Sequence, residues 1–176
     1  ISLITTHDFK EDGDLIVLLG VFREEIGGSE YLLTVYGKEE GAPPQLNLKL
    51  EKSVNDTCIE AIQHGIIKSA HDCSEGGISV ALAESCISGS MGAYIDIKNP
   101  HHLRPDILLF GESQSRIVVT LKEVNLSKLN KLAEKNKAPL EVLGTTGGDR
   151  LQIGSLVDLS VDELKGVWGK ALEKQL

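Results

Sequence analysis

The chain has 176 residues, of which 41% are hydrophobic and 25% are charged, and its formal net charge is −8. This length and composition are those of one globular domain with a sizeable core. The acidic balance argues against a nucleic-acid-binding face, which would be basic, and no apolar run approaches the roughly 18 residues of a membrane span. We therefore expect neither nucleic acid nor a membrane among its partners.

The three cysteines are odd in number and lack C-x-x-C spacing, so the sequence predicts no disulfide framework and no metal site. Free thiols are typical of a reducing compartment, and we expect a cytoplasmic protein. The sequence begins at Ile1 and carries no secretory signal, which suggests a piece of a longer chain. It shows no repeat and no linker, so we predict a single domain over residues 1–176.

The beginning of the chain predicts a buried strand, a segment of undecided type and a helix. Residues 14–22, DLIVLLGVF, form a continuous apolar run bounded by glycines, as buried strands do. The next stretch, EEIGGSEYLLTVYG, contains a turn at Gly27–Gly28 and an apolar segment compatible with either a helix or a strand. Apolar residues then recur every four positions, which indicates an amphipathic helix ending near Gly65. These residues are Leu50, Val54, Cys58 and Ile62.

The middle of the chain predicts a strand, a helix and then further strands. Residues 66–71 form a short strand, and residues 78–87 form a helix that stops near Gly89. GAYIDI, residues 92–97, alternates apolar and other side chains as a half-buried strand does. DILLFGES and the β-branched run RIVVTL, residues 116–121, follow, so only strands are expected before the next helix.

The end of the chain predicts a helix, a hairpin and a last helix. Leu126, Leu129, Leu132 and Ala133 form the helical stripe. PLEVLGTT and RLQIGSL flank Gly147–Gly148–Asp149, where glycine supplies the positive φ of a hairpin turn. Ser160 and Glu163 have the spacing of a capping box at the start of the last helix. This interleaving predicts an α/β sandwich with helices packed on a mixed β-sheet.

The stretch HDCSEGGISVALAES, residues 71–85, is the first candidate for a ligand site, because a strand leads through polar residues and two glycines into a helix. The first turn of a helix leaves N–H groups without partners and carries partial positive charge. Gly76 and Gly77 have no side chains, so an anion could approach the backbone closely. Ser74 could cap the helix instead, which would make an ordinary turn. The acids here would repel a bare phosphate, but Asp72 could accept hydrogen bonds from ribose hydroxyls.

The stretch FGESQSR, residues 110–116, is the second candidate, because its polar residues lie where an apolar segment turns into a strand and function gathers at such ends. The alternative is a plain turn in which Glu112 pairs with Arg116. We expect the two junctions to share one edge of the fold and to line one pocket. The residues of the predicted substrate or nucleotide pocket are Asp72, Ser74, Gly76, Gly77, Glu112, Ser113 and Gln114.

Cys73 lies two residues from His71, a spacing compatible with a nucleophile and its base. Nothing in the sequence supplies an oxyanion hole or a third, orienting group. We therefore expect an unreactive thiol and predict no catalytic residue in this chain.

These two stretches in combination, with GGSEYL near the start and DELKGVWGKAL at the end, resemble the last domain of the phosphoribosylformylglycinamidine synthases over nearly the whole chain. The resemblance implies the sandwich of the PurM-type carboxy-terminal domain, and specifically the second such domain of that enzyme. D-x-x-x-G-G alone is shared by the wider aminoimidazole ribonucleotide synthetase superfamily. Hydrogenase-maturation proteins, selenophosphate synthetases and thiamine-phosphate kinases of that superfamily are the alternatives.

The resemblance implies that the parent enzyme is a ligase of purine biosynthesis that uses ATP, magnesium and ammonia from a glutaminase subunit. It converts the amide of formylglycinamide ribonucleotide into an amidine. The family's catalytic histidine and its ATP- and magnesium-binding segments match no part of this sequence, so no residue here inherits those roles. The isolated domain is expected to be inactive and to bind no cofactor firmly by itself.

In the first half of such enzymes, the segment related to ESQ contacts the ribonucleotide. By that pattern Glu112, Ser113, Gln114, Asp72 and the Gly76–Gly77 turn face a corresponding pocket, which in the second half is either an ancillary nucleotide site or structural. The expected partners are the remaining domains of the synthetase, the glutaminase subunit and a second copy of the chain. The contrasting hypothesis is a domain without catalytic function that uses its acidic surface to hold subunits together.

Overall fold

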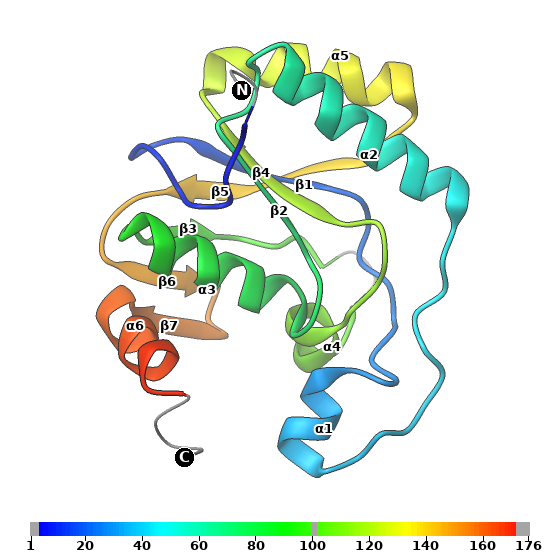
Figure 1. Ribbon diagram of the computed structural model, residues 1–176, viewed down its shortest axis with the longest axis vertical. Coiled ribbons are helices and arrows are strands. Elements are labelled where there is room, and N and C mark those ends of the chain that lie inside the picture. Colours follow the sequence, from blue (N-terminus) through cyan, green and yellow to red (C-terminus); the bar gives the residue numbers. More distant parts are fainter. Residues whose placement is uncertain (1–3, 100–101, 172–176) are drawn as a thin grey trace.

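The computed structural model describes residues 4–99 and 102–171 and shows helices packed on both faces of a seven-stranded sheet (Figure 1). The strands are β1 (Leu15–Leu19), β2 (Ser69–Asp72), β3 (Ala93–Ile95), β4 (Ile117–Leu121), β5 (Leu140–Thr146), β6 (Arg150–Ile153) and β7 (Val157–Ser160). The helices are α1 (Glu30–Tyr36), α2 (Leu48–Gln63), α3 (Gly77–Gly89), α4 (Pro105–Phe110), α5 (Leu126–Asn136) and α6 (Val161–Gly169), with a 3₁₀ turn at Glu123–Asn125.

The strands lie in the order β2-β4-β1-β5-β3-β6-β7. All neighbouring pairs are antiparallel except β3 and β6, which are parallel. The sheet is therefore mixed, and the predicted α/β sandwich is confirmed. No helix in the described ranges is long and apolar enough to cross a membrane.

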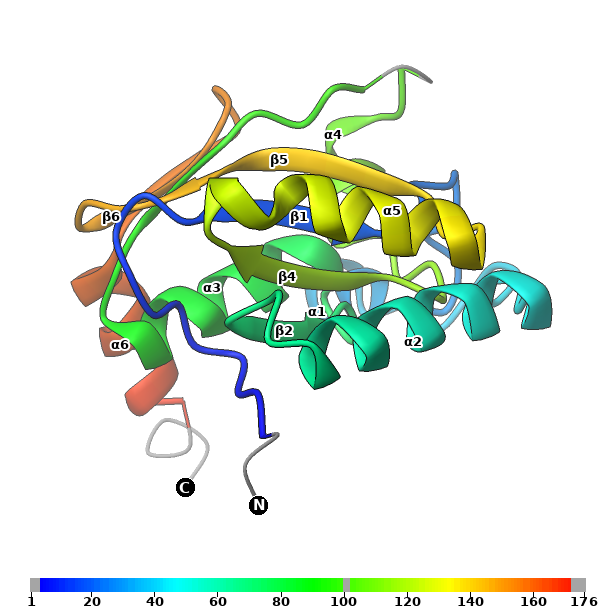
Figure 2. The same ribbon diagram turned by 90° about the horizontal axis from the view of Figure 1, so that it is seen from above.

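β1 lies inside the sheet and is buried on both faces, which explains its continuous apolar run. Ile16 and Leu18 pack in the core that contains α3. Val17 and Leu19 point to the opposite core, under α2 and α5, which lie side by side over that face (Figure 1 and Figure 2). One strand thus joins two hydrophobic cores.

The edge strand β2 is covered by the segment that precedes β1. The Ala70 amide donates to the Thr6 carbonyl oxygen over 3.1 Å. Phe9 follows and is only 2% exposed, and its amide donates to the Ser85 carbonyl of α3. The N-terminal segment therefore closes this edge of the sheet and packs into the core.

The predicted hairpin between residues 139–146 and 150–156 is wrong, because β3 lies between β5 and β6. Gly92, just before β3, exchanges backbone hydrogen bonds with Gly147 and Gly148, so the glycine turn accommodates a third strand. The hairpin in this region joins β6 to β7 instead, with Ile153 opposite Val157.

The expectation of only strands between α3 and α5 is also wrong. Residues 105–110 form the helix α4, which begins with Pro105 at its first turn, where proline needs no hydrogen-bonded N–H. The undecided segment after Gly28 is the helix α1, capped by Ser29, whose Oγ accepts from the Leu32 amide. The predicted capping box of Ser160 and Glu163 at the start of α6 is confirmed.

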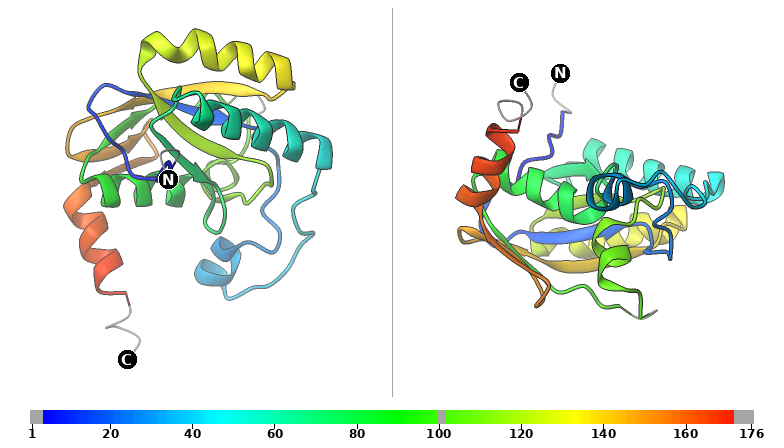
Figure 3. Two further views of the ribbon diagram at one scale, coloured as in Figure 1. Left: turned by 45° about the horizontal axis from the view of Figure 1, so that its top comes forward. Right: turned by 90° about the horizontal axis from the view of Figure 1, so that it is seen from below.

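Residues 20–47 leave the sheet, form α1 and return to α2, and the left view of Figure 3 shows α1 (light blue) outside the layers of the sheet and its helices. α1 has no buried residue. Tyr31 stacks on Phe110 with 4.9 Å between ring centroids, which fixes the start of α1 to α4. We call residues 20–47 the α1 excursion.

Candidate functional site

The two polar junctions predicted from the sequence lie side by side, at the turn between β2 and α3 and the loop between α4 and β4 (Figure 1). They border a hollow of about 300 Å³, closed on a third side by the start of α2. We call it the acidic pocket. Its lining residues are Glu51, Asn55, Asp72, Cys73, Ser74, Glu75, Glu112, Gln114, Ser115, Arg116 and Ile117.

One carboxylate oxygen joins the two junctions. Glu112 Oε1 accepts from the Gly76 amide over 2.9 Å, at the start of α3, and from the Glu30 amide over 2.9 Å, at the start of α1. A carboxylate is favourable here because the first amides of a helix lack partners within the helix. Glu112 therefore occupies the place at α3 where the sequence suggested an approaching anion.

Both alternatives that would have made these junctions ordinary turns are wrong. Ser74 does not cap α3, because its hydroxyl donates to Asp72 Oδ2. Glu112 does not pair with Arg116, whose guanidinium donates instead to the carbonyl oxygens of Ser113, over 3.0 Å from Nε, and of Gly111.

The two glycines of the first junction are required by its packing. Gly76 has φ of 75° and Gly77 has φ of 65°, conformations that side-chain-bearing residues rarely adopt. A Cβ on Gly76 would overlap the Val80 side chain, and a Cβ on Gly77 would come within 2.8 Å of the Leu109 carbonyl oxygen. The space near Gly77 is thus filled by α4 and the residue after it.

The predicted pocket residues have different surroundings. Asp72, Ser74, Glu112 and Gln114 line the acidic pocket, and Gln114 is exposed. Ser113 points elsewhere, since it is 1% exposed and its Oγ has no hydrogen-bond partner among the described residues. Four of the predicted side chains therefore meet at one surface.

The contribution of α2 was missed from the sequence. Glu51 accepts from Asn55 Nδ2 over 2.7 Å and from Ser115 Oγ over 2.6 Å, so α2 and the second junction are bonded directly. The two residues are one helical turn apart beside the apolar stripe of α2. From the sequence, Glu51 and Asn55 could be predicted only to lie on the polar face of the helix. Their spacing does not indicate which loop they contact.

The acidic pocket has a strong excess of hydrogen-bond acceptors. Its four carboxylates, on Glu51, Asp72, Glu75 and Glu112, form no ion pair with a Lys or Arg of the described residues. A hydrogen bond from Ser74 lowers the pKa of Asp72, which keeps that carboxylate ionised. Such a pocket suits a ligand group rich in donors, such as hydroxyls or amines, and repels a bare phosphate.

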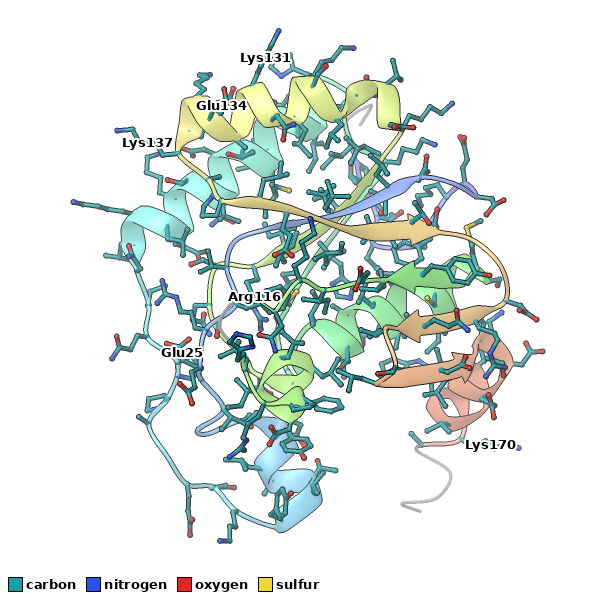
Figure 4. The ribbon with its side chains drawn as sticks, turned by 180° about the vertical axis from the view of Figure 1, so that it is seen from behind. Glu25, Arg116, Lys131, Glu134, Lys137 and Lys170 are labelled. Carbon is teal, nitrogen blue, oxygen red and sulfur yellow. The ribbon has the colours of Figure 1, made fainter. Side chains whose placement is uncertain are left out.

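Among the described residues, Arg116 is the only Lys or Arg that lines the acidic pocket, and it is 3% exposed. Burial lowers its pKa, but a guanidinium stays charged. In Figure 4 its side chain lies inside the molecule, whereas Lys131, Glu134 and Lys137 of the α5 region point to solvent.

Cys73 is 7% exposed, and burial raises the pKa of its thiol to about 11. His71 is engaged elsewhere, with its Nε2 2.8 Å from Glu84 Oε2. The raised pKa disfavours the thiolate at neutral pH, and the nearby imidazole is bonded to Glu84 and not to the thiol.

Comparison with known proteins supplies a family. The family model of the AIR synthase related protein, C-terminal domain, matches residues 11–154. The phosphoribosylformylglycinamidine synthase subunit PurL of Anaeromyxobacter sp. (strain K) is 45% identical over an alignment of 173 residues, which covers 93% of this chain and 23% of that protein. This chain thus spans about a quarter of the length of that relative.

Solved structures share the fold. T. maritima PurL complexed with FGAR superposes with a TM-score of 0.75 at 19% identity, covering 93% of this chain and 29% of that one. T. maritima PurL complexed with ATP gives a TM-score of 0.70 at 19% identity, covering 93% and 27%. These likenesses show that the curled mixed sheet with its packed helices is the fold of this chain too.

Proposed function

The chain belongs to the family of AIR synthase related proteins, C-terminal domain, and from this membership we propose that it serves as the second such domain of a phosphoribosylformylglycinamidine synthase. The name of the 45% identical relative supports this enzyme over the kinases and selenophosphate synthetases of the superfamily. The proposed parent is a cytoplasmic ATP-dependent ligase of purine biosynthesis. It would form the amidine from formylglycinamide ribonucleotide with ammonia from a glutaminase subunit.

The proposal assigns ATP and magnesium to other parts of the parent. Within residues 4–99 and 102–171, no three His, Cys, Asp or Glu side chains are grouped to hold a metal ion. The acidic pocket also offers no pair of cations for a triphosphate. The residues of this chain therefore do not fit an ATP–magnesium site by themselves, and we derive no chemical step through that group.

The proposed role of the acidic pocket is to form part of the wall of a ribonucleotide or nucleotide site. The contact that supports this most is the bond from the Gly76 amide to Glu112 Oε1, because it brings the two motifs together over one hollow. Asp72 and Gln114 would accept hydrogen bonds from the two ribose hydroxyls. The phosphate of the ligand would need cations from another domain.

Isothermal titration of the chain with formylglycinamide ribonucleotide, ADP and ATP tests this role. We expect heat from at least one of them, and the Gln114→Ala variant should weaken binding about 3- to 10-fold, since one hydrogen bond contributes about 0.5–1.5 kcal/mol. Gln63→Ala is the matched control, because Gln63 is exposed at the end of α2 and away from the pocket. Gly77 is a poor choice for this test, because any side chain there would disrupt the fold.

Absence of heat with all three ligands would favour the alternative function, a domain without a ligand that holds subunits of the synthetase together.

An activity assay tests the proposal that the catalytic groups lie in the other domains of the parent enzyme. The isolated chain should hydrolyse no ATP and form no amidine, whereas addition of the remaining synthetase domains and the glutaminase should restore activity. Turnover by the chain alone would contradict the proposal.

A further inference from the structure

Arg116 is a buried cation without a carboxylate partner. Its residue is 3% exposed, and it forms no ion pair with any residue in the two described ranges. Burial of an unpaired charge is unfavourable, so such a residue usually has a specific role. Glu25 and Glu112 are charged neighbours, but neither is in ion-pair contact with it.

The guanidinium of Arg116 is bonded to the loop that carries the second motif. Its Nε donates to the Ser113 carbonyl oxygen over 3.0 Å, and its Nη2 donates to the Gly111 carbonyl oxygen. These two carbonyls stand immediately before and after Glu112 in the sequence. Residues 111–113 therefore curve around the Arg116 side chain. Ser115, with φ of 64°, lies in the turn that leads from this loop to Arg116.

The position of Arg116 is itself tightly determined. The Phe22 ring centroid lies 5.9 Å from its Cζ atom, and a Cβ on Gly20 would come within 3.1 Å of its Cγ atom. Both neighbours belong to the chain just after β1, an internal strand of the sheet. The side chain of Arg116 is therefore packed against the segment after β1, and its guanidinium binds the loop.

Because the carbonyls on both sides of Glu112 are fixed, the place where its side chain leaves the backbone is fixed too. Glu112 Oε1 can then reach the amides of Gly76 and Glu30 at the same time. These two amides lie at the starts of two different helices, α3 and α1.

We propose that Arg116 is a positioning residue: its guanidinium, by binding the Gly111 and Ser113 carbonyls, sets the Glu112 carboxylate that joins the starts of α1 and α3 beside the acidic pocket. This inference rests on the proposed function only in that the acidic pocket is taken to be part of a ligand site. The same carboxylate also links the α1 excursion to the pocket, because Glu112 lines the pocket and its Oε1 accepts from the Glu30 amide at the start of α1.

Amide hydrogen exchange of the chain without ligand tests the proposal. In Arg116→Ala, we expect exchange at Gly76 and Glu30 to rise about tenfold or more relative to the Val17 amide in the centre of β1. Val17 is the internal reference, since a general loss of stability would raise exchange at all three amides alike. Equal rises at the three amides would overturn the positioning role.

Chemical rescue tests whether the charged guanidinium group is needed at this position. Millimolar ethylguanidinium, which replaces the missing part of the side chain, should restore slow exchange at Gly76 and Glu30 in Arg116→Ala. Ethylurea has nearly the same shape but no charge and serves as the matched control. Rescue by ethylurea to the same extent would show that neutral N–H donors are sufficient and would overturn the role assigned to the charged guanidinium.

Arg116→Lys provides a second variant that keeps the buried charge if the alanine variant does not fold. An ammonium lacks the planar fork that binds two carbonyls at once, so exchange at Gly76 and Glu30 should still rise, by about threefold. Wild-type rates in this variant would contradict a role for the fork. None of these measurements needs a ligand, so failure of the proposed pocket in calorimetry would leave their outcome unaffected.

Discussion

Glu112 and Glu141 are both partly buried carboxylates, but they have opposite surroundings. Glu112 receives two backbone N–H groups through one oxygen. Glu141 Oε1 is buried and has no hydrogen-bond partner among the described residues, and burial raises the pKa of this carboxyl above its usual value. The ionised carboxylate is thus stabilised by hydrogen bonds at Glu112 and disfavoured by burial at Glu141.

We expect Glu141→Gln to stabilise the protein at pH 7. A carboxyl whose pKa is raised in the folded state disfavours the fold wherever it is ionised, and the effect disappears as the pH falls below the unfolded value of about 4.3. The gain should be less than about 1 kcal/mol, because the side chain is partly exposed and solvent weakens the effect.

Urea denaturation at pH 7 and pH 4 measures this gain. The difference between Glu141→Gln and the wild type should be present at pH 7 and shrink toward zero at pH 4. Glu134→Gln on the exposed side of α5 is the matched control and should change little at either pH (Figure 4). A gain of the same size at both pH values would refute the electrostatic explanation.

At the scale of elements, local patterns predicted most helices but not the neighbours of the strands. The four-residue stripe of α2 and the capping box of α6 depend on residues close in sequence, so the chain alone reveals them. The order β5-β3-β6 depends on Gly92 bonding to Gly147 and Gly148, a contact between segments far apart in sequence. A glycine turn between two strands has the same local pattern whether or not a third strand enters between them.

Gly144 offers a test of that strand order. It lies opposite Ile95 of β3, and a Cβ there would overlap the carbonyl oxygen of Tyr94. Gly144→Ala should therefore lower the free energy of unfolding by about 1–3 kcal/mol, since β3 and β5 must separate locally. Denaturation monitored by circular dichroism measures the change.

Gly166 in α6 is the matched control for this substitution. A Cβ there meets nothing within 4 Å, and alanine favours a helix over glycine by up to about 1 kcal/mol. Gly166→Ala should thus be neutral or stabilising. An equal loss from both substitutions would contradict the close contact of β3 with β5.

At the scale of the whole molecule, the candidate site is built from three segments that the chain order separates. The two junction motifs could be predicted because glycines and polar residues interrupt apolar runs at residues 71–77 and 110–116. That the two motifs line one pocket could only be expected from the sequence, because it depends on how distant segments fold together. The participation of Glu51 and Asn55 could not be predicted, since it depends on how α2 lies across the sheet.

The covered edge of the sheet leads to a prediction about the whole molecule. Removal of residues 1–9 would expose β2 and remove the buried ring of Phe9. We expect this variant to be less stable by about 3–5 kcal/mol from the lost ring and to form aggregates through the bare strand edge. Size-exclusion chromatography with light scattering measures the association.

Phe9→Ala separates the two effects of that deletion. It loses the same ring but keeps Thr6 bonded to Ala70 at the edge of β2. This variant should lose stability and remain a single species on the column. Aggregation equal to that of the deletion would assign the effect to instability and not to the open edge.

The α1 excursion also bears on how such a chain can change over evolution. Within it, the helix α1 contacts the rest of the molecule near its start, through Tyr31 stacked on Phe110 and the Glu30 amide bonded to Glu112. Lengthening a flexible loop adds little entropy cost, so insertions between Gly37 and Glu40 would leave sheet, cores and pocket as they are. The segment after α1 is therefore where a reporter could be grafted, on a helix whose start is bonded to Glu112 beside the pocket.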